Sequence, residues 1–186
     1  MDGDHWSILD VGAGLPQDQV LALLQARNGD LWLGTGRGLA RWDGSQIEVF
    51  ATEDGLPGDE VLDLLETRNG DLWISAESGV ARFDGESFEV FDDEDGLPRY
   101  VLDMHEDAEG GIWFATHGGV VRYDGDSFTR YTMDDGLASN DVHSVHMDSA
   151  GVLWAGTDGG GISRFDGEVF QSLSARDGLP DNVTLS

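Results

Sequence analysis

The sequence predicts an all-β fold, a β-propeller built of four-stranded antiparallel blades, and three observations predict it. Gly-Leu-Pro or a close variant recurs about every 41 residues, at Gly14, Gly55, Gly96, Gly136 and Gly178. A tryptophan recurs with the same period, and so does a block of arginine, aromatic residue, aspartate and glycine. Three markers that agree in phase indicate one structural unit repeated along the chain.

The second repeat shows how the strands of a blade are assigned. Residues 61–66 form an apolar run of strand length, and Asn69-Gly70 after it predicts a two-residue hairpin, because both residues tolerate positive φ. The later strands and turns follow in order, with strands at 72–74, 80–83 and 88–91 and turns at 78–79 and 84–85. Turn signals about every 8–12 residues exclude helical repeats, which need two long segments of helical period.

The phase of the repeat predicts a single array over residues 1–186. Complete repeats are expected at residues 15–55, 56–96, 97–136 and 137–178. Residues 1–14 align with a lone fourth strand, and residues 179–186 align with a partial first strand. A fourth strand and a first strand without the two middle strands do not make up a blade. We therefore expect the chain to close a ring with copies of itself, or else to form a small four-bladed ring with frayed ends; exposed end faces and strand edges favour self-association.

The composition narrows the function classes. The chain carries 37 acidic and 10 basic residues, a formal net charge of −27. A surface of this sign repels phosphate backbones, so nucleic-acid binding is not expected. The lack of cysteine excludes disulfides and thiolate metal sites. No apolar run reaches the roughly 18 residues of a membrane span, and the acidic N-terminus lacks the pattern of a signal peptide, so we expect no membrane contact by this segment.

Two sets of repeated residues are assigned to the structural core. Tryptophans at one blade position are expected to fill the space between blades, because identical residues at identical positions serve the fold. They are Trp32, Trp73, Trp113 and Trp154. Arginines ahead of the Asp-Gly turns are expected to pair with a nearby aspartate or to stack on an aromatic ring. They are Arg41, Arg82, Arg122 and Arg164. A ligand-stacking set and an anion-binding ring are the alternatives.

The candidate ligand-binding residues lie where the repeat varies. The loop between the second and third strands keeps a constant frame while its first side chain changes, and the loop after the fourth strand, on the same side of each blade, varies too. Repeat proteins commonly build sites in this way. The expected ligand face carries Arg37, Glu77, His117, Asp158, Arg99 and Tyr100. Neutral variation of exposed loops is the alternative.

The sequence predicts no metal site, no cofactor and no catalytic residue. The acidic runs at residues 92–95 and 134–135 lack the spacing of a calcium-binding loop. His143 and His146 are three residues apart on one expected strand, so their side chains point to opposite faces. His105 holds a similar strand position one repeat earlier, and no His-Glu-x-x-His motif is present.

The repeat resembles that of the two-component regulator propeller family. The resemblance rests on Asp-Gly-Leu-Pro, a valine that starts a strand, Gly-x-Leu-Trp, and Gly-Leu/Val-x-Arg-aromatic-Asp-Gly, over nearly the whole chain. It implies blades like those in the sensor region of bacterial hybrid two-component regulators, which lie outside the cytoplasm and help to sense ligands, often carbohydrate fragments. A periplasmic or extracellular location is implied in the same way. The blade architecture is carried over to these residues, but signalling activity is not.

Three functions are weighed on this basis. We expect a non-enzymatic binding or sensing scaffold that takes a small polar or carbohydrate ligand on its loop face. The alternative is a structural self-assembling module, in which contact between blades is the function and no ligand is bound. A remote alternative is a propeller lyase, because some lyases with similar blades use a histidine on the top face. His117 is the candidate there, but the sequence places no second catalytic group.

Overall fold

The fold of the described residues is all-β, as predicted, with four sheets of four antiparallel strands in sequence order. The computed structural model describes residues 8–181. Blade 1 comprises β1 (Val20–Gln25), β2 (Leu31–Thr35), β3 (Gly38–Trp42) and β4 (Ile47–Phe50). Blade 2 comprises β5 (Val61–Glu66), β6 (Leu72–Ala76), β7 (Gly79–Phe83) and β8 (Phe88–Phe91). Blade 3 comprises β9 (Val101–Glu106), β10 (Ile112–Thr116), β11 (Gly119–Tyr123) and β12 (Phe128–Tyr131). Blade 4 comprises β13 (Val142–Met147), β14 (Leu153–Thr157), β15 (Gly161–Phe165) and β16 (Phe170–Leu173).

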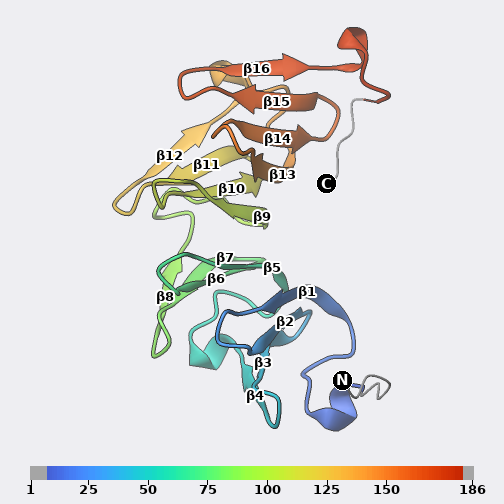
Figure 1. Cartoon of the computed structure of the whole chain (residues 1–186), viewed down its shortest axis with the longest axis vertical. Helices are drawn as coiled ribbons and strands as arrows, with labels where there is room; N and C mark the ends of the chain where they lie inside the picture. The colour runs from blue at the N-terminus through green and yellow to red at the C-terminus, as the bar shows by residue number, and fades with distance from the viewer. Residues whose placement is uncertain (1–7, 182–186) are drawn as a thin grey trace.

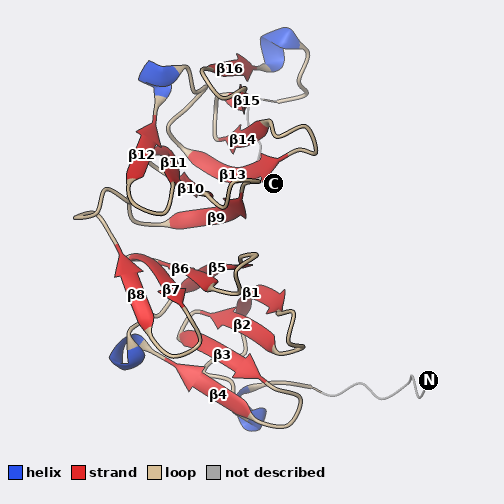
Figure 2. Cartoon of the chain, turned by 60° about the vertical axis from the view of Figure 1, so that its left-hand side comes forward, coloured by secondary structure: helices blue, strands red, loops and turns tan. Residues whose placement is uncertain are grey.

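The blades follow one another in an open arc. The first strands are innermost and pack in series, β1 on β5, β5 on β9 and β9 on β13. Blades 1 and 4 lie at opposite ends of the molecule in both views (Figures 1 and 2), so the four blades do not close into a ring by themselves. Each crossover returns the chain from an outer strand to the next inner strand. The crossovers into blades 2 and 4 begin with the 3₁₀ turns Thr52–Asp54 and Met133–Asp135.

The first hairpin of blade 2 differs from the predicted two-residue turn. The Thr67 N–H donates to the Asp71 carbonyl at 2.9 Å, so three residues connect the strands. Gly70 has φ of 100°, whereas Asn69 is not among the residues with positive φ. This is the three-residue loop in which a left-handed glycine ends the turn. The Asn69 side chain acts instead by accepting the Thr67 hydroxyl at 2.6 Å.

The termini test the expected partial repeats only in part. The lone fourth strand predicted within 1–14 and the first strand predicted within 179–186 fall mainly on residues outside the described range 8–181. Inside that range the N-terminal segment forms a 3₁₀ turn, Val11–Ala13, ahead of Gly14. In the described residues, no helix has the length and hydropathy to cross a membrane.

Aromatic side chains and aliphatic side chains fill the layers between blades. Trp73 and Trp113 stack on Phe91 and Tyr131, with ring centroids 5.5 and 5.8 Å apart. Both tryptophans are almost fully buried because the next blade covers them. Trp154, at the same position of blade 4, stays partly exposed, because no blade follows it in the described chain. The periodic tryptophans thus stand at the blade interfaces.

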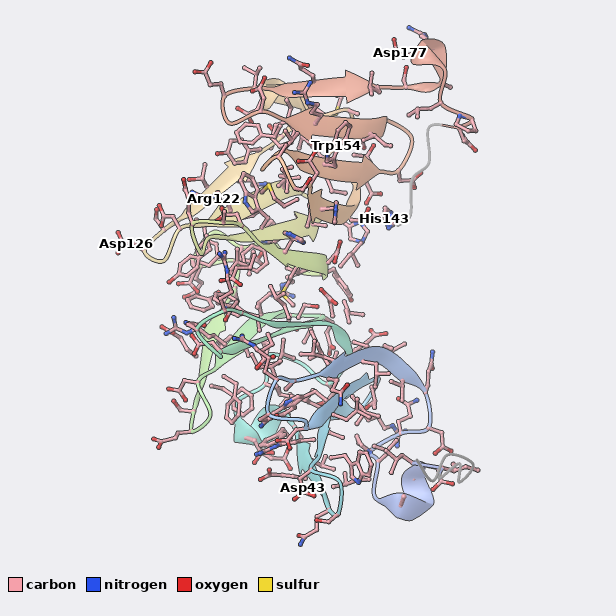
Figure 3. All side chains as sticks on the ribbon, viewed as in Figure 1. Asp43, Arg122, Asp126, His143, Trp154 and Asp177 are labelled. Carbon is pink, nitrogen blue, oxygen red and sulfur yellow. The ribbon has the colours of Figure 1, made fainter. Side chains whose placement is uncertain are left out.

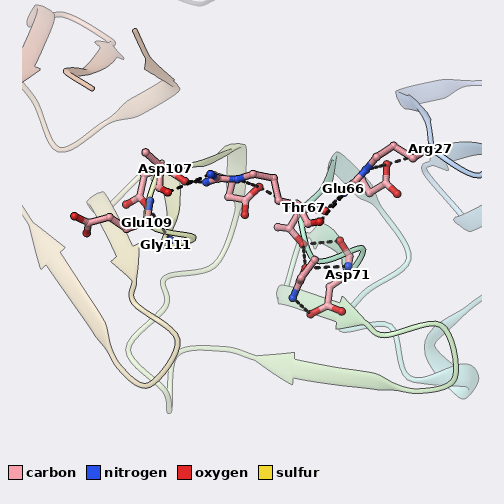
Figure 4. A network of polar contacts seen from close by, with 11 residues as sticks. Arg27, Glu66, Thr67, Asp71, Asp107, Glu109 and Gly111 are labelled. Atoms are coloured by element: carbon pink, nitrogen blue, oxygen red, sulfur yellow. Dashed lines mark hydrogen bonds and ion pairs between the residues drawn. The ribbon is translucent and has the colours of Figure 1, made fainter. Parts of the chain in front are cut away.

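Arginine side chains connect blades 1, 2 and 3 along one rim of the arc (Figure 4). This rim is formed by the hairpin between the first and second strands of each blade. The Arg27 guanidinium in blade 1 donates to the Arg68 carbonyl of blade 2 at 3.0 Å and also to the Thr67 carbonyl. Arg68 repeats this contact one blade on, donating to the Ala108 carbonyl at 3.1 Å. These arginine-to-carbonyl contacts are here called arginine clasps. Ala108 is the equivalent residue of blade 3, so the junction between blades 3 and 4 lacks an arginine clasp.

Carboxylates join the innermost strands of the later blades. The Met104 N–H in β9 donates to Asp63 Oδ2 in β5 at 2.9 Å. The Val145 N–H in β13 donates to Asp103 Oδ2 in β9 at 2.8 Å. Blade 1 has Ala22 at the equivalent position and cannot make this contact with β5. The three junctions therefore share one packing layer but differ in their polar contacts.

Candidate functional site

A group of histidine and aspartate side chains lies on the loop rim where blade 3 meets blade 4. His117 comes from the β10–β11 turn of blade 3. Asp141 ends the crossover into blade 4, and His143 is the second residue of β13 (Figure 3). Asp158 stands in the β14–β15 turn of blade 4. The fold brings together residues from two blades because the turns after second strands and the crossovers meet on one side of the arc.

Asp141 is the centre of this group. The His117 Nδ1 contacts Asp141 Oδ1 at hydrogen-bonding distance. The His143 Nε2 lies 3.6 Å from the same oxygen. The Asp158 N–H donates to the Asp141 carbonyl at 2.9 Å, so the two acidic residues are held together through their backbones. One ligand atom from each of Asp141, His143 and Asp158 lies within 4.8 Å of the others.

Tyr100 lies beside this group in a backbone conformation that tyrosine seldom adopts. Its φ is 54°, the one positive φ of a non-glycine residue in the range 8–181. The crossover into blade 3 is one residue shorter than the others, and Tyr100 stands just ahead of β9. Its ring is 6.4 Å from the His117 ring, edge to face. An exposed aromatic side chain held in a left-handed conformation is typical of a functional position.

The group is accessible and carries unbalanced negative charge. The side chains of His117 and Asp141 are 50% and 42% exposed, whereas that of His143 is 25% exposed. Within the described part of the chain, no arginine forms an ion pair with Asp141 or Asp158, so the histidines are the available counter-groups. A ligand at this rim therefore meets two carboxylates, two imidazoles and one phenol ring.

The structure separates the six predicted ligand residues into two sets. His117, Asp158 and Tyr100 belong to the rim between blades 3 and 4. Glu77 turns to its own crossover, where its carboxylate accepts the Glu60 N–H at 2.6 Å. Arg99 pairs with Asp93 at 3.0 Å, and Arg37 lies on blade 1 at the other end of the arc. All six residues lie on loops along one side of the arc, and three of them, His117, Asp158 and Tyr100, meet at the junction between blades 3 and 4.

Two residues of the group, Asp141 and His143, were missed by the sequence analysis. A signal for His143 was present, because the other three repeats carry leucine there, at Leu21, Leu62 and Leu102. The loop with Asp158 is also one residue longer than its counterparts. Departures from the repeat at these strand-start and loop positions, taken together, point to the junction that carries the group.

The repeated tryptophans and arginines line pockets on the opposite rim. The pocket between blades 3 and 4 has a volume of about 420 Å³ and includes Trp113, Arg122 and Asp107. Its counterpart between blades 2 and 3 includes Trp73 and Arg82, with a volume of about 350 Å³. The periodic tryptophan and arginine line both pockets and so follow from the repeat, whereas Arg68 of the second pocket is replaced by Ala108 in the first.

Three of the four repeated arginines bind carboxylates. Arg41 contacts Asp30 at 2.6 Å, and Arg122 contacts Asp107 at 2.8 Å. The Arg122 guanidinium also lies over the Trp113 ring, 5.5 Å from its centroid. Arg82 pairs with Glu89 at 2.5 Å, and Arg164 forms no ion pair with a carboxylate among residues 8–181. With their charge already paired, Arg41, Arg82 and Arg122 do not form an open ring for anions.

Comparison with solved structures gives the same architecture. The extracellular domain assigned to the hybrid two component system BT3049 from B. thetaiotaomicron is 22% identical over 88% of this chain and 24% of that chain, with a TM-score of 0.78. That of BT4673 from the same organism is 22% identical over 90% of this chain and 24% of that chain, with a TM-score of 0.73. This chain thus spans about a quarter of the length of those domains.

Lyase propellers share the fold as well. Virginiamycin B lyase from Staphylococcus aureus is 15% identical over 83% of this chain and 55% of that chain, with a TM-score of 0.66. At such identities the likeness concerns the fold alone. No curated protein matches the chain in sequence.

The sequence of the blades matches a known repeat family. The model for the two component regulator propeller matches residues 14–37, 55–78, 93–118 and 136–159, which together make up more than half of the chain. Each match begins at or ahead of the glycine of a crossover and extends to the turn between the second and third strands, so it contains the periodic tryptophan. The family predicted from the sequence is confirmed, and the chain belongs to the two-component regulator propeller family.

Proposed function

We propose that this chain is a non-enzymatic binding module of an extracytoplasmic sensor, and that it takes a small polar ligand, such as a carbohydrate fragment, at the rim between blades 3 and 4. The observation that carries the proposal is the convergence of Tyr100, His117 and Asp158 with Asp141 and His143 at one junction. The likeness to the extracellular domains of two component systems supports the sensing role.

The chemistry of the rim supports a neutral, hydroxyl-rich ligand over an anion. The net charge of −27 repels anions at long range, and the two carboxylates repel them at contact. Carboxylate and imidazole groups accept and donate hydrogen bonds to hydroxyl groups, while the exposed face of Tyr100 offers an apolar surface to a sugar ring. No catalytic step is assigned to the group.

A titration of the chain with a panel of neutral oligosaccharides, followed by calorimetry, tests the proposal. Tyr100→Ala removes the ring and is expected to weaken binding at least about tenfold, equal to about 1.4 kcal/mol. Arg37→Ala is the matched control, because Arg37 occupies a variable loop on the same side of blade 1. Equal affinity of the Tyr100 variant and the native chain, or equal loss in the Arg37 variant, would contradict the assignment.

A second role, self-association, is supported by the end faces of the arc. Val20 and Leu23 on β1 are 40% and 64% exposed, whereas Val61 and Leu64, at the same positions of β5, are 0% and 8% exposed. The difference arises because Trp32 and Leu39 of blade 1 cover blade 2, whereas no blade among residues 8–181 covers blade 1. Val20 and Leu23 are here called the blade 1 end face.

The opposite end of the arc offers the complementary surface. Trp154 is partly exposed and Leu173 is 44% exposed on blade 4, where the preceding blades pack a buried tryptophan and a buried or partly buried aromatic residue against their neighbour. We propose that the blade 1 end face of a second copy packs on this surface and continues the interface already repeated within the chain. Such an end-to-end contact is heterologous, so it closes only if the rotation per blade permits a ring.

A further inference from the structure

We infer that Asp141, His143 and Asp158 form a binding site for a divalent transition-metal ion of the zinc class. The inference names an occupant for the rim that the proposed function uses, and so it builds on that proposal. No metal site is predicted from the sequence, because no local motif has metal-ligand spacing. The three ligands come from a crossover, a strand and a turn, and the fold alone assembles them.

The donor set selects the class of ion. One imidazole nitrogen and two carboxylate oxygens can meet at one point, because their atoms lie within 4.8 Å of one another. Imidazole is a common ligand of zinc, copper, nickel and iron but not of calcium or magnesium, which take oxygen ligands. Three protein ligands leave a coordination position open to water or to a ligand hydroxyl, as in zinc sites that bind other molecules.

The surroundings hold the ligands in place. The Asp158 N–H donates to the Asp141 carbonyl at 2.9 Å. This hydrogen bond fixes the two acidic residues relative to each other. The His117 imidazole contacts Asp141 Oδ1 and is placed to orient this carboxylate, a role that outer hydrogen-bond partners have in metal sites. The His117 and His143 rings lie 5.8 Å apart and nearly perpendicular, so His117 supports the site from the side of blade 3.

Electrostatics favours a cation at this place. Within residues 8–181 the Asp158 carboxylate has no hydrogen-bond donor or ion-pair partner, and Asp141 is paired with histidine alone. A divalent ion would neutralise two carboxylates on a chain whose net charge is −27. No other set of three such side chains converges in the described residues, so the acidic surface as a whole does not supply an equivalent site.

Zinc titration of the whole chain by calorimetry, with no sugar present, tests the inference. One zinc ion per chain is expected, and cobalt in place of zinc is expected to give a visible absorption band of a protein-bound ion. His143→Leu restores the residue of the other three repeats, so the fold is expected to survive while binding is lost. Asp158→Asn is expected to lower the affinity as well, and His117→Gln to lower it about 10-fold to 100-fold.

His146→Gln is the matched control, because His146 lies on the same strand and faces His105, with ring centroids 5.4 Å apart. Its affinity for zinc is expected to equal that of the native chain. Unchanged binding in His143→Leu, or calcium binding as tight as zinc binding at the same stoichiometry, would overturn the inference. Zinc alone is the probe, so the two proposals can fail separately. If the native chain binds zinc but binds no oligosaccharide, the carbohydrate proposal is rejected and the metal site is kept.

Discussion

The Asp63 carboxylate on the innermost strand of blade 2 accepts the backbone N–H of Met104 in blade 3 at 2.9 Å. Burial and, to a lesser degree, the neighbouring Asp103 carboxylate together raise the pKa of Asp63 to about 7. The junction between blades 2 and 3 therefore depends on a carboxyl group that the folded state prefers to keep protonated.

This relationship predicts how stability changes with pH. A carboxyl group whose pKa is higher in the folded state stabilises the fold below its unfolded pKa, near 4, and this contribution is lost as pH rises toward about 7. Asp63→Asn keeps an oxygen acceptor for Met104 without the charge. We expect it to raise the free energy of unfolding above pH 7 by about 1–3 kcal/mol, measured by urea denaturation at pH 5 and pH 8.

Asp43→Asn is the control of opposite sign. Hydrogen bonds from the Gln46 N–H and from Ser45 lower the pKa of the exposed Asp43, so its contribution is present above pH 4 and is lost on acidification. This variant is expected to lose stability at pH 8, where Asp63→Asn gains it. A loss of stability in Asp63→Asn at both pH values would show that the charge is needed in the folded state.

The arginine clasps predict a difference between the junctions. Arg68→Ala removes the donors to the Ala108 and Asp107 carbonyls and is expected to lower the free energy of unfolding by about 1 kcal/mol. Arg37→Ala, which removes an exposed arginine of blade 1, is expected to change it by less than about 0.5 kcal/mol. Thermal unfolding of the two variants measures the difference, and equal melting temperatures would mean that the clasp contributes nothing measurable.

The backbone conformation of Tyr100 predicts that a substitution there raises stability and weakens ligand binding. Its φ of 54° costs about 1–2 kcal/mol for a residue with a Cβ atom, and the residue is 46% exposed, so little packing is lost on removal of its side chain. Tyr100→Gly is expected to raise the melting temperature while it weakens oligosaccharide binding. A lower melting temperature would show that the ring is needed for the fold and would remove the argument from strain.

The end faces predict association in solution. Light scattering behind a sizing column is expected to give a discrete multiple of the 20.1 kDa chain, favoured at high salt because salt screens the repulsion between acidic copies. Leu23→Glu places a charge on the blade 1 end face and is expected to give a monomer. A compact monomer of the native chain at both low and high salt would reject the second role.

Much of the fold could be predicted from sequence because the repeat samples the same strand pattern four times. The strands Val61–Glu66 and Phe88–Phe91 match the predicted ranges, since alternation and turn residues act over short distances. The Asn69-Gly70 turn was wrong in type, because the dipeptide signal does not distinguish a two-residue loop from a three-residue loop whose last residue is glycine.

The candidate site could be predicted only in part. His117, Tyr100 and Asp158 were identified as departures from the repeat. The assignment of Arg37, Glu77 and Arg99 to the same loop face stays a prediction, because spacing along the chain does not tell which blades bring such loops into contact. An arc keeps Arg37 far from blade 4, and local carboxylate contacts engage Arg99. Asp141 and His143 were missed because their partners are in another blade or in a later turn, which spacing along the chain does not reveal.

The central claim is that function resides at the rim between blades 3 and 4. Its most direct test is amide chemical-shift mapping by NMR while the chain is titrated with an oligosaccharide that it binds. We expect shifts that cluster at Tyr100, His117, Asp141 and Asp158, with residues of blade 1 unaffected. Shifts confined to the opposite rim, around the pocket of Trp113 and Arg122, would contradict it.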